Sequence, residues 1–302
     1  MPLGYDGQLY ILAFDHRGSF KKMFGVGDDA TPEQMERLKS AKQLVWEGVQ
    51  LALDGGAPAD KVGVLVDEEM GTTVAEEAKA RGVTLAMPVE ASGQEVFDFE
   101  YGDEFGEHIT AFDPDFSKVL VRWNPDDADD AKQLQGERLK RLGDWLHAND
   151  RKYLFELLVP ASERQLALVG GDTDAYDAEV RPYATLEAIE EIQSAGVEPD
   201  VWKIEGLDRQ RSCELLAALT RRDGRDSVIS VVLGRGADDA KVEHWLRQGA
   251  PVPGYAGFAI GRSIWKAEVQ AWGDGSMDRE TAARGIAANY RKFVDVYEDA
   301  SA

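Results

Sequence analysis

Eight short apolar segments, separated by longer segments of helical period, constrain this chain more than any other feature of its sequence. Their apolar character is nearly continuous rather than alternating, which is typical of parallel strands buried on both faces. We therefore expect eight parallel strands. They lie at 9–14, 61–67, 83–89, 118–123, 152–159, 200–204, 227–233 and 256–261.

The intervening segments carry apolar residues at the three-to-four-residue spacing of a helix face. The clearest of them, residues 32–53, begins with Pro32 after Thr31, a favoured helix start, and places Leu38 and Val45 on one stripe. Further helices are expected at 70–81, 128–148, 184–195, 208–222, 237–248, 262–271 and 278–298.

Eight strands, each followed by a helix without a linker-like break, predict a closed (β/α)8 barrel in which residues 1–302 form one domain and the last helix is an appendage. A doubly wound open sheet is the runner-up, but its Gly-rich fingerprint is missing after the first strand, where the chain has the sequence DHRGSF. Two long connections, 90–117 and 160–183, follow the third and fifth strands. They fall on the side of the barrel where active sites are built.

The composition limits the partners of the protein. Asp and Glu number 56 against 34 Lys and Arg, and the resulting net charge of -22 disfavours nucleic acid or an anionic membrane as a partner. The N-terminus lacks the basic and apolar regions of a signal peptide, and no apolar run approaches the ~18 residues of a membrane span, so we expect a cytoplasmic protein. Trp265 and Trp272 would suit either a homo-oligomer interface or packing against the barrel.

Charged side chains within or directly after the buried strands indicate a functional site. A charge in a protein core is costly unless it is paired, so a ring of opposite charges at one mouth of a barrel indicates a functional site. Because side chains alternate along a strand, the inward-facing or strand-end set can be proposed. It comprises Asp15, His16, Arg17, Asp67, Glu90, Lys118, Arg122, Glu156, Lys203 and Glu205.

Lys203 and Glu156 differ from the others because they lie inside apolar runs rather than past their ends. A lysine among apolar neighbours and other cations has a lowered pKa, so its amine can attack a carbonyl group at neutral pH. The iminium that forms withdraws electrons when the adjacent carbon–carbon bond breaks, and Glu156 is placed to move the protons. For Asp67, Glu90 and Arg122, a structural ion pair or a solvated strand end is equally expected.

Two Gly-Arg elements predict a site for a phosphate group. Glycine lets backbone N–H groups approach an anion at a helix start, and arginine adds a bidentate partner. Barrels often bind phosphate after the seventh and eighth strands. These are the positions of Gly234, Arg235 and Gly236 and of Gly261 and Arg262.

Metal chemistry has little support in the sequence. The four histidines are scattered without HxH or HExxH spacing, and a single cysteine, Cys213, excludes a Cys-based metal site, so we expect no cofactor. A Mg²⁺ ion held by Asp67 or Glu90 stays open as an alternative. His16 is assigned to the site without a defined role.

The strand-end motifs together resemble one known family. They are AFDHRGSF (13–20), LVDEEMG (65–71), PVEASGQ (88–94), FEYGDEFGEHI (99–109), KVLVRWNP (118–125), FELLVP (155–160), DVWKIEGLD (200–208), VLGRGA (232–237) and GFAIGRSIW (257–265). This set is similar to the 2-deoxy-5-keto-gluconate-6-phosphate aldolase-like family, which is found fused behind the sugar kinase of bacterial myo-inositol catabolism. A more distant resemblance is to the class I tagatose-bisphosphate and sulfofructose-phosphate aldolases.

The resemblance implies a class I aldolase that cleaves a phosphorylated keto-sugar acid to dihydroxyacetone phosphate and malonate semialdehyde. It implies that Lys203 forms the Schiff base, that Glu156 transfers protons and that Lys118 reaches the substrate. Gly261 and Arg262 would hold the phosphate. No kinase domain is present in the sequence, so we expect a stand-alone aldolase.

Two departures from the distant aldolases bear on the substrate. Those aldolases have glutamine after the first-strand aspartate, where this chain has His16. Arg122 and the 234–236 element have no clear counterpart there, so a second anionic group, such as a carboxylate, would bind near them.

Two alternatives remain open from the sequence. One is a different reaction in the same barrel: an isomerase, a transaldolase or a Mg²⁺-assisted lyase. The other is a non-catalytic sugar-phosphate-binding protein, in which Lys203 and Glu156 form a structural bridge.

Overall fold

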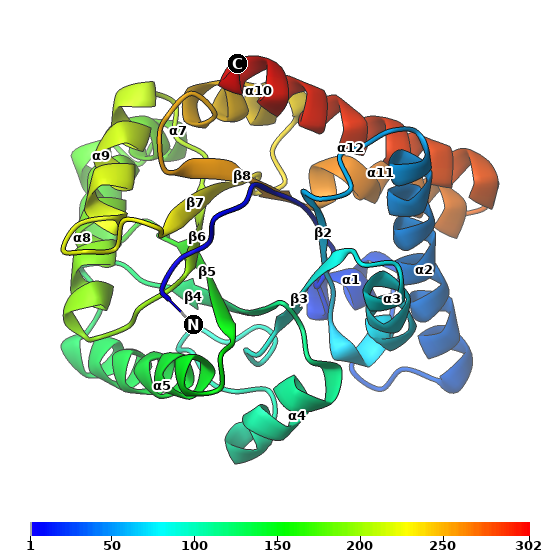
Figure 1. Ribbon diagram of the computed structural model, residues 1–302, viewed down its shortest axis with the longest axis horizontal. Coiled ribbons are helices and arrows are strands. Elements are labelled where there is room, and N and C mark those ends of the chain that lie inside the picture. The colour runs from blue at the N-terminus through cyan, green and yellow to red at the C-terminus, as the bar shows by residue number, and fades with distance from the viewer. Residues whose placement is uncertain (1) are drawn as a thin grey trace.

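The computed structural model describes residues 2–302 and shows a closed barrel of eight parallel strands (Figure 1). Each strand pairs with the next, and β8 pairs with β1 to close the ring. The predicted (β/α)8 fold is therefore confirmed. The strands are β1 Leu9–Ala13, β2 Val62–Leu65, β3 Thr84–Pro88, β4 Phe116–Arg122, β5 Lys152–Leu158, β6 Val201–Glu205, β7 Ile229–Leu233 and β8 Tyr255–Ile260.

A ring of long helices surrounds the barrel, and each helix lies close to its expected range (Figure 1). α2 begins with a capping box, in which the Thr31 side chain accepts from the Gln34 N–H and the Gln34 side chain accepts from the Thr31 N–H. The helices of the ring are α2 Pro32–Asp54, α3 Glu68–Ala80, α5 Asp129–Ala148, α8 Arg181–Ser194, α9 Gln210–Thr220, α10 Asp239–Gly249, α11 Arg262–Gly273 and α12 Arg279–Ser301.

The connections at the carboxyl ends of the strands contain short helices that the sequence pattern did not predict. In the connection after β3, the ring of Phe99 stacks on Phe105 at 4.5 Å, and Phe105 contacts Trp145 of α5 edge-on. The acidic, aromatic stretch thus packs its own rings against the barrel. The short elements are α1 Gly18–Met23, α4 Phe105–Phe112, α6 Glu163–Leu168, α7 Thr173–Ala175, a 3₁₀ turn at Gly102–Glu104 and a π-helical turn at Tyr176–Val180.

The barrel interior is divided into an apolar half and a charged half. Small and branched residues such as Ile11, Leu154 and Val201 fill the half nearer the amino ends of the strands. Further along β4, β5 and β6, on the same inward-facing side of each strand, lie Lys118, Glu156 and Lys203. The apolar layers fill the barrel as a packed core, and the charged layer lies above them, toward the carboxyl ends of the strands.

The last helix closes the seam between the first and last strands. The Tyr290 hydroxyl of α12 donates to the backbone carbonyl of Tyr10 in β1. The Tyr297 hydroxyl accepts from the Gly257 N–H of β8 at 2.7 Å. Gly257 has φ +133°, and a Cβ there would lie 1.9 Å from the Leu9 carbonyl oxygen, so this crossing requires glycine. The appended helix therefore belongs to the barrel wall.

The two tryptophans near the C-terminal helices lie differently. Trp265 is fully buried, and its indole N–H donates to the Ala13 carbonyl at 2.9 Å, which selects packing against the barrel for this residue. Trp272 is partly buried and lies under the guanidinium of Arg279.

Among residues 2–302, no helix is both long enough and apolar enough to cross a membrane.

Candidate functional site

A cavity of about 740 Å³ opens at the carboxyl ends of the strands. Nearly all of the predicted site residues lie on its wall; Gly234 instead packs toward Ile260 and Val242. The predicted residues that line the cavity are Asp15, His16, Arg17, Glu90, Lys118, Arg122, Glu156, Lys203, Glu205, Arg235, Gly236, Gly261 and Arg262. The sequence did not single out other lining residues, among them Ser19, Lys22, Gln94, Tyr176 and Asp177.

Lys118 is the centre of the charged floor. Its Nζ lies 2.8 Å from Asp15 Oδ2, 2.8 Å from Glu90 Oε1 and 3.0 Å from Glu156 Oε2. Lys118 donates hydrogen bonds to Asp15 and Glu90, and Glu156 adds a third opposite charge. Burial by itself would lower the pKa of Lys118, but the carboxylates outweigh it and hold the pKa above its ordinary value. Lys118 is therefore a fixed positive charge.

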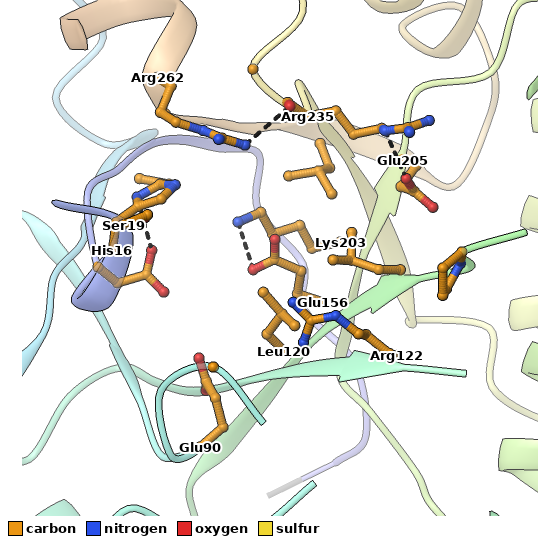
Figure 2. Close-up of a pocket in the computed structure, with 18 of the residues that line it drawn as sticks. His16, Ser19, Glu90, Leu120, Arg122, Glu156, Lys203, Glu205, Arg235 and Arg262 are labelled. Carbon is orange, nitrogen blue, oxygen red and sulfur yellow. Dashed lines mark hydrogen bonds and ion pairs between the residues drawn. The ribbon is translucent and has the colours of Figure 1, made fainter. Parts of the chain in front are cut away.

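Lys203 has a different environment. Its Cα is the register partner of Glu156 on the neighbouring strand, and its Nζ donates to Glu156 Oε2 at 2.9 Å (Figure 2). The side chain is 2% exposed, and Glu156 is its one hydrogen-bond acceptor among residues 2–302. Two of its N–H donors are therefore left over beside the cavity.

Glu156 bridges the two lysines through one oxygen. Burial alone would raise the pKa of its carboxyl group, but the charges of Lys118 and Lys203 keep the pKa below its usual range. The same balance lowers the pKa of Asp15. For Glu90, burial dominates over the attraction of Lys118 and Arg17, and the pKa is raised. The floor thus contains carboxyl groups whose pKa values are shifted in opposite directions.

His16 lies at the end of β1 beside the cavity, with its ring edge against Trp265. Burial lowers the pKa of His16 to about 4, against the attraction of Asp15 and with the help of nearby positive charges such as Lys42. The imidazole is neutral at physiological pH. Its buried Nδ1 has no hydrogen-bond partner among the described residues and lies 4.0 Å from Asp15 Oδ1.

Two of the cavity arginines are held by acidic side chains. Arg17 contacts Glu100 at 2.9 Å and Glu90 at 3.6 Å, and it donates to the Glu90 carbonyl. Arg235, in the left-handed region at φ +52°, contacts Asp177 at 2.7 Å and Glu205 at 3.0 Å. These contacts make Arg17 and Arg235 parts of the cavity wall.

Arg122 and Arg262 have no carboxylate partner anywhere in residues 2–302. Arg262 follows Gly261 at the start of α11 and donates to the Arg235 carbonyl oxygen at 3.1 Å. Arg122, at the end of β4, donates to the Gln94 carbonyl oxygen at 2.7 Å. Figure 2 shows the two guanidinium groups on different sides of Lys203. Both are available to an anion in the cavity.

Asp67 does not belong to the cavity. Its Oδ1 lies 2.6 Å from Nζ of Lys42, a fully buried lysine of α2, and its Oδ2 accepts from the Met70 N–H at the start of α3. Lys42 also donates to the carbonyl oxygens of Phe14 and His16, and so fixes the end of β1. Lys42 is four residues beyond Leu38 on the apolar stripe of its helix, which was the sequence signal for it.

The two carboxylates considered for Mg²⁺ are engaged with cationic side chains: Asp67 with Lys42, and Glu90 with Lys118 and Arg17. Within residues 2–302, no cluster of three or more histidine, cysteine or acidic side chains is arranged to hold a metal ion.

The closed parallel barrel with a charged cavity at its carboxyl mouth defines a protein of the (β/α)8 class. The chain belongs to the family described as "Uncharacterized protein conserved in bacteria (DUF2090)", whose model matches residues 5–301. No curated protein matches the sequence.

Two solved structures with the same fold cover nearly the whole chain. One is a fructose-bisphosphate aldolase from Plasmodium falciparum, in a complex with TRAP and a small-molecule inhibitor. It has a TM-score of 0.66 and 16% identity over 97% of this chain and 91% of that one. The other is Cgl0159 from Corynebacterium glutamicum, with a TM-score of 0.55 and 18% identity over 96% of this chain and 88% of that one. At these identities the likeness establishes the fold.

Proposed function

We propose that this protein is a class I aldolase that acts on a phosphorylated keto-sugar or keto-sugar acid through a Schiff base on Lys203. The observation that carries the proposal is the difference between the two buried lysines of the cavity floor. Both line the cavity, but Lys118 lies against three carboxylates, whereas Lys203 has one such partner.

A buried lysine with one carboxylate partner suits covalent catalysis. When Lys203 passes a proton to Glu156, both groups become neutral and the amine gains the lone pair it needs to attack a ketone. Lys118 remains charged and stays beside Glu156 at 3.0 Å, so the carboxyl group keeps a partner in either state. A bare structural bridge would need neither the cavity nor the second lysine.

The proposed reaction balances within these groups. The Lys203 amine adds to the ketone carbon, and loss of water gives an iminium. A base removes the proton of the hydroxyl on the second carbon from the iminium carbon. The bond between that carbon and the carbon next to the iminium then breaks, the carbinol becomes an aldehyde, and the electron pair of the broken bond neutralises the iminium to form an enamine. The aldehyde leaves, the enamine takes a proton, and water releases the second product and restores the amine. Glu156 is the proposed proton carrier, and Asp15 is a second candidate because it also lines the cavity.

The phosphate would bind at Arg262. Gly261 directly precedes Arg262, and a Cβ on Gly236 would lie 3.1 Å from the guanidinium carbon. Lys22 and Ser19 also line the cavity. A guanidinium free of carboxylates, next to glycine backbone at the start of α11, matches the way in which proteins hold phosphate groups.

The strand-end motifs support a particular substrate, 2-deoxy-5-keto-gluconate 6-phosphate, with dihydroxyacetone phosphate and malonate semialdehyde as the products. The fold shared with a fructose-bisphosphate aldolase is consistent with this chemistry. As part of the same proposal, we expect the enzyme to be cytoplasmic and to need no metal.

Trapping with borohydride tests the proposal directly. Borohydride added with dihydroxyacetone phosphate should leave a reduced, covalent adduct on the peptide that contains Lys203, detected by mass spectrometry, and EDTA should not change turnover. Lys203→Met should abolish both the adduct and turnover.

Two other outcomes would replace the proposal. Loss of turnover in EDTA with unmodified Lys203 would indicate a metal-dependent lyase. A wild-type protein that binds sugar phosphates without turnover, together with unchanged binding by Lys203→Met, would indicate a sensor.

A further inference from the structure

Arg122 is an unusual side chain in so acidic a protein. The chain has a net charge of -22, yet this guanidinium has no acidic partner among residues 2–302. It borders the cavity from the end of β4, while its Nη1 donates to the Gln94 carbonyl oxygen at 2.7 Å. That single bond orients the group and leaves most of its N–H donors unused.

Gln94 supplies a second, independent observation. Its Nε2 is buried and has no hydrogen-bond partner in the part of the chain that the structure describes. Gln94 also lines the cavity, in the connection that follows β3. A buried amide N–H group without an acceptor is costly, so a ligand that supplies the acceptor would gain free energy there.

The other positive groups of the cavity do not compete for this role. Arg17 and Arg235 are held by carboxylates, and Lys118 lies against three of them. Arg262 and Arg122 are therefore the cavity arginines without an acidic partner among residues 2–302. Lys203 lies between the two arginines in Figure 2.

We propose that Arg122 and Gln94 form a subsite for a carboxylate on the fragment that leaves as the aldehyde. This inference rests on the proposed aldolase function and deepens it, since it assigns residues to the carboxylate end of a keto-sugar acid phosphate. The fragment bonded to Lys203 carries its phosphate toward Arg262. The leaving fragment extends to the opposite side and ends at Arg122.

A carboxylate fits this subsite better than a second phosphate group. One guanidinium and one amide N–H offer donors in number and charge for a planar anion with a single negative charge. Arg262 instead adjoins Gly236 at the start of α11, a setting that suits a phosphate group, whereas Arg122 lies at the end of a strand.

Aldol synthesis with matched aldehydes tests the subsite. The enzyme is supplied with dihydroxyacetone phosphate and either 3-oxopropanoate or propanal, two aldehydes of equal length that differ in the carboxylate. Wild type should have the lower KM for 3-oxopropanoate. Arg122→Gln should raise that KM about 10- to 100-fold, the usual cost of a lost charged hydrogen-bonded pair, and should leave the KM for propanal unchanged.

Two further variants sharpen the experiment. Gln94→Glu places a negative charge beside the carboxylate and should also raise the KM for 3-oxopropanoate alone. Arg141→Gln, an exposed arginine outside this cavity, should change neither KM. Equal KM values for the two aldehydes in wild type, or equal increases for both in Arg122→Gln, would overturn the subsite.

Borohydride trapping separates this inference from the function on which it rests. Adduct formation with dihydroxyacetone phosphate alone should be the same in Arg122→Gln and wild type, because that ligand lacks the carboxylate. If wild type forms no adduct, the aldolase proposal fails, and titration calorimetry with malonate then tests the subsite by itself. At least tenfold weaker malonate binding by Arg122→Gln would support it, and equal binding would overturn it.

Discussion

Two of the buried lysine–carboxylate pairs, those of Lys42 and Lys203, have similar contact distances and different surroundings. Lys42 and Asp67 lie 2.6 Å apart between α2 and the barrel, and Lys203 and Glu156 lie 2.9 Å apart inside the barrel. Lys42 has acceptors for all three of its N–H groups, while Lys203 has one. A saturated buried lysine holds structure together, and an unsaturated one beside a cavity is free to react.

The largest expected difference is in activity. Lys203→Met should lower turnover by roughly 10⁴-fold or more, because loss of a covalent nucleophile removes the whole reaction path. The free energy of unfolding should change by about 1 kcal/mol or less, because Glu156 keeps its contact with Lys118. Steady-state kinetics and urea unfolding of the same preparation measure both. A large loss of stability in this variant would indicate that Lys203 has a structural role.

Lys42→Met should do the reverse and reduce the free energy of unfolding by about 3–5 kcal/mol, since it leaves Asp67 buried without a counter-charge. It also removes the donor for the backbone at the end of β1. Urea unfolding monitored by tryptophan fluorescence gives the value. The comparison between the pairs breaks down if the stability of Lys42→Met equals that of wild type.

The pH dependence of stability should show the neutral state of His16. Its pKa in the folded protein is about 4, below the 6.5 of an unfolded histidine, so the unfolded chain binds the proton first as the pH falls. Stability should decrease between about pH 6.5 and 4, by about 2–3 kcal/mol for this group. His16→Gln should remove that part of the slope in urea unfolding series. Superimposable slopes for the two proteins would refute the assignment.

The smallest effect on stability is expected for a solvent-exposed ion pair. Lys140 and Asp144 form an exposed contact of 2.6 Å one turn apart on α5. Asp144→Asn should change the free energy of unfolding by less than about 0.5 kcal/mol, because solvent screens exposed pairs. Thermal unfolding in low and high salt checks this, and a change above 1 kcal/mol would show that burial is not what separates the three pairs.

Most of the barrel could be predicted because buried parallel strands leave a period-free apolar pattern and helices leave a period of 3.6 residues. The missed elements are short: α4 has apolar residues at helical spacing, Phe105, Ile109 and Phe112, but only eight residues in all. α4 contains Gly106, a weak helix former, yet a Cβ there would lie 2.8 Å from the ring of Trp145. That glycine is required by a neighbour distant in sequence, which the local pattern does not record.

The same reasoning explains what could be predicted of the candidate site. Lys118, Glu156 and Lys203 were assigned to one cavity because strand alternation fixes the direction of a side chain. Arg235 shows the limit, since its partner Asp177 lies in a connection without periodicity. Sequence spacing identified the charges, but only the structure shows which of them are already neutralised by a neighbour.

The tyrosine-lined seam between β1 and β8 has a consequence for the order of folding. β1 leaves the ribosome early, but its partners on one edge, β8 and α12, are made roughly 250 residues later. Until they emerge, β1 has an open edge, and Asp15 lacks the neighbouring strand after which Gly261 and Arg262 follow. Closure of the ring and completion of the anion-binding side are thus one event. A chain halted before Tyr255 would therefore lack both the strand that closes the barrel and the residues of the anion-binding side.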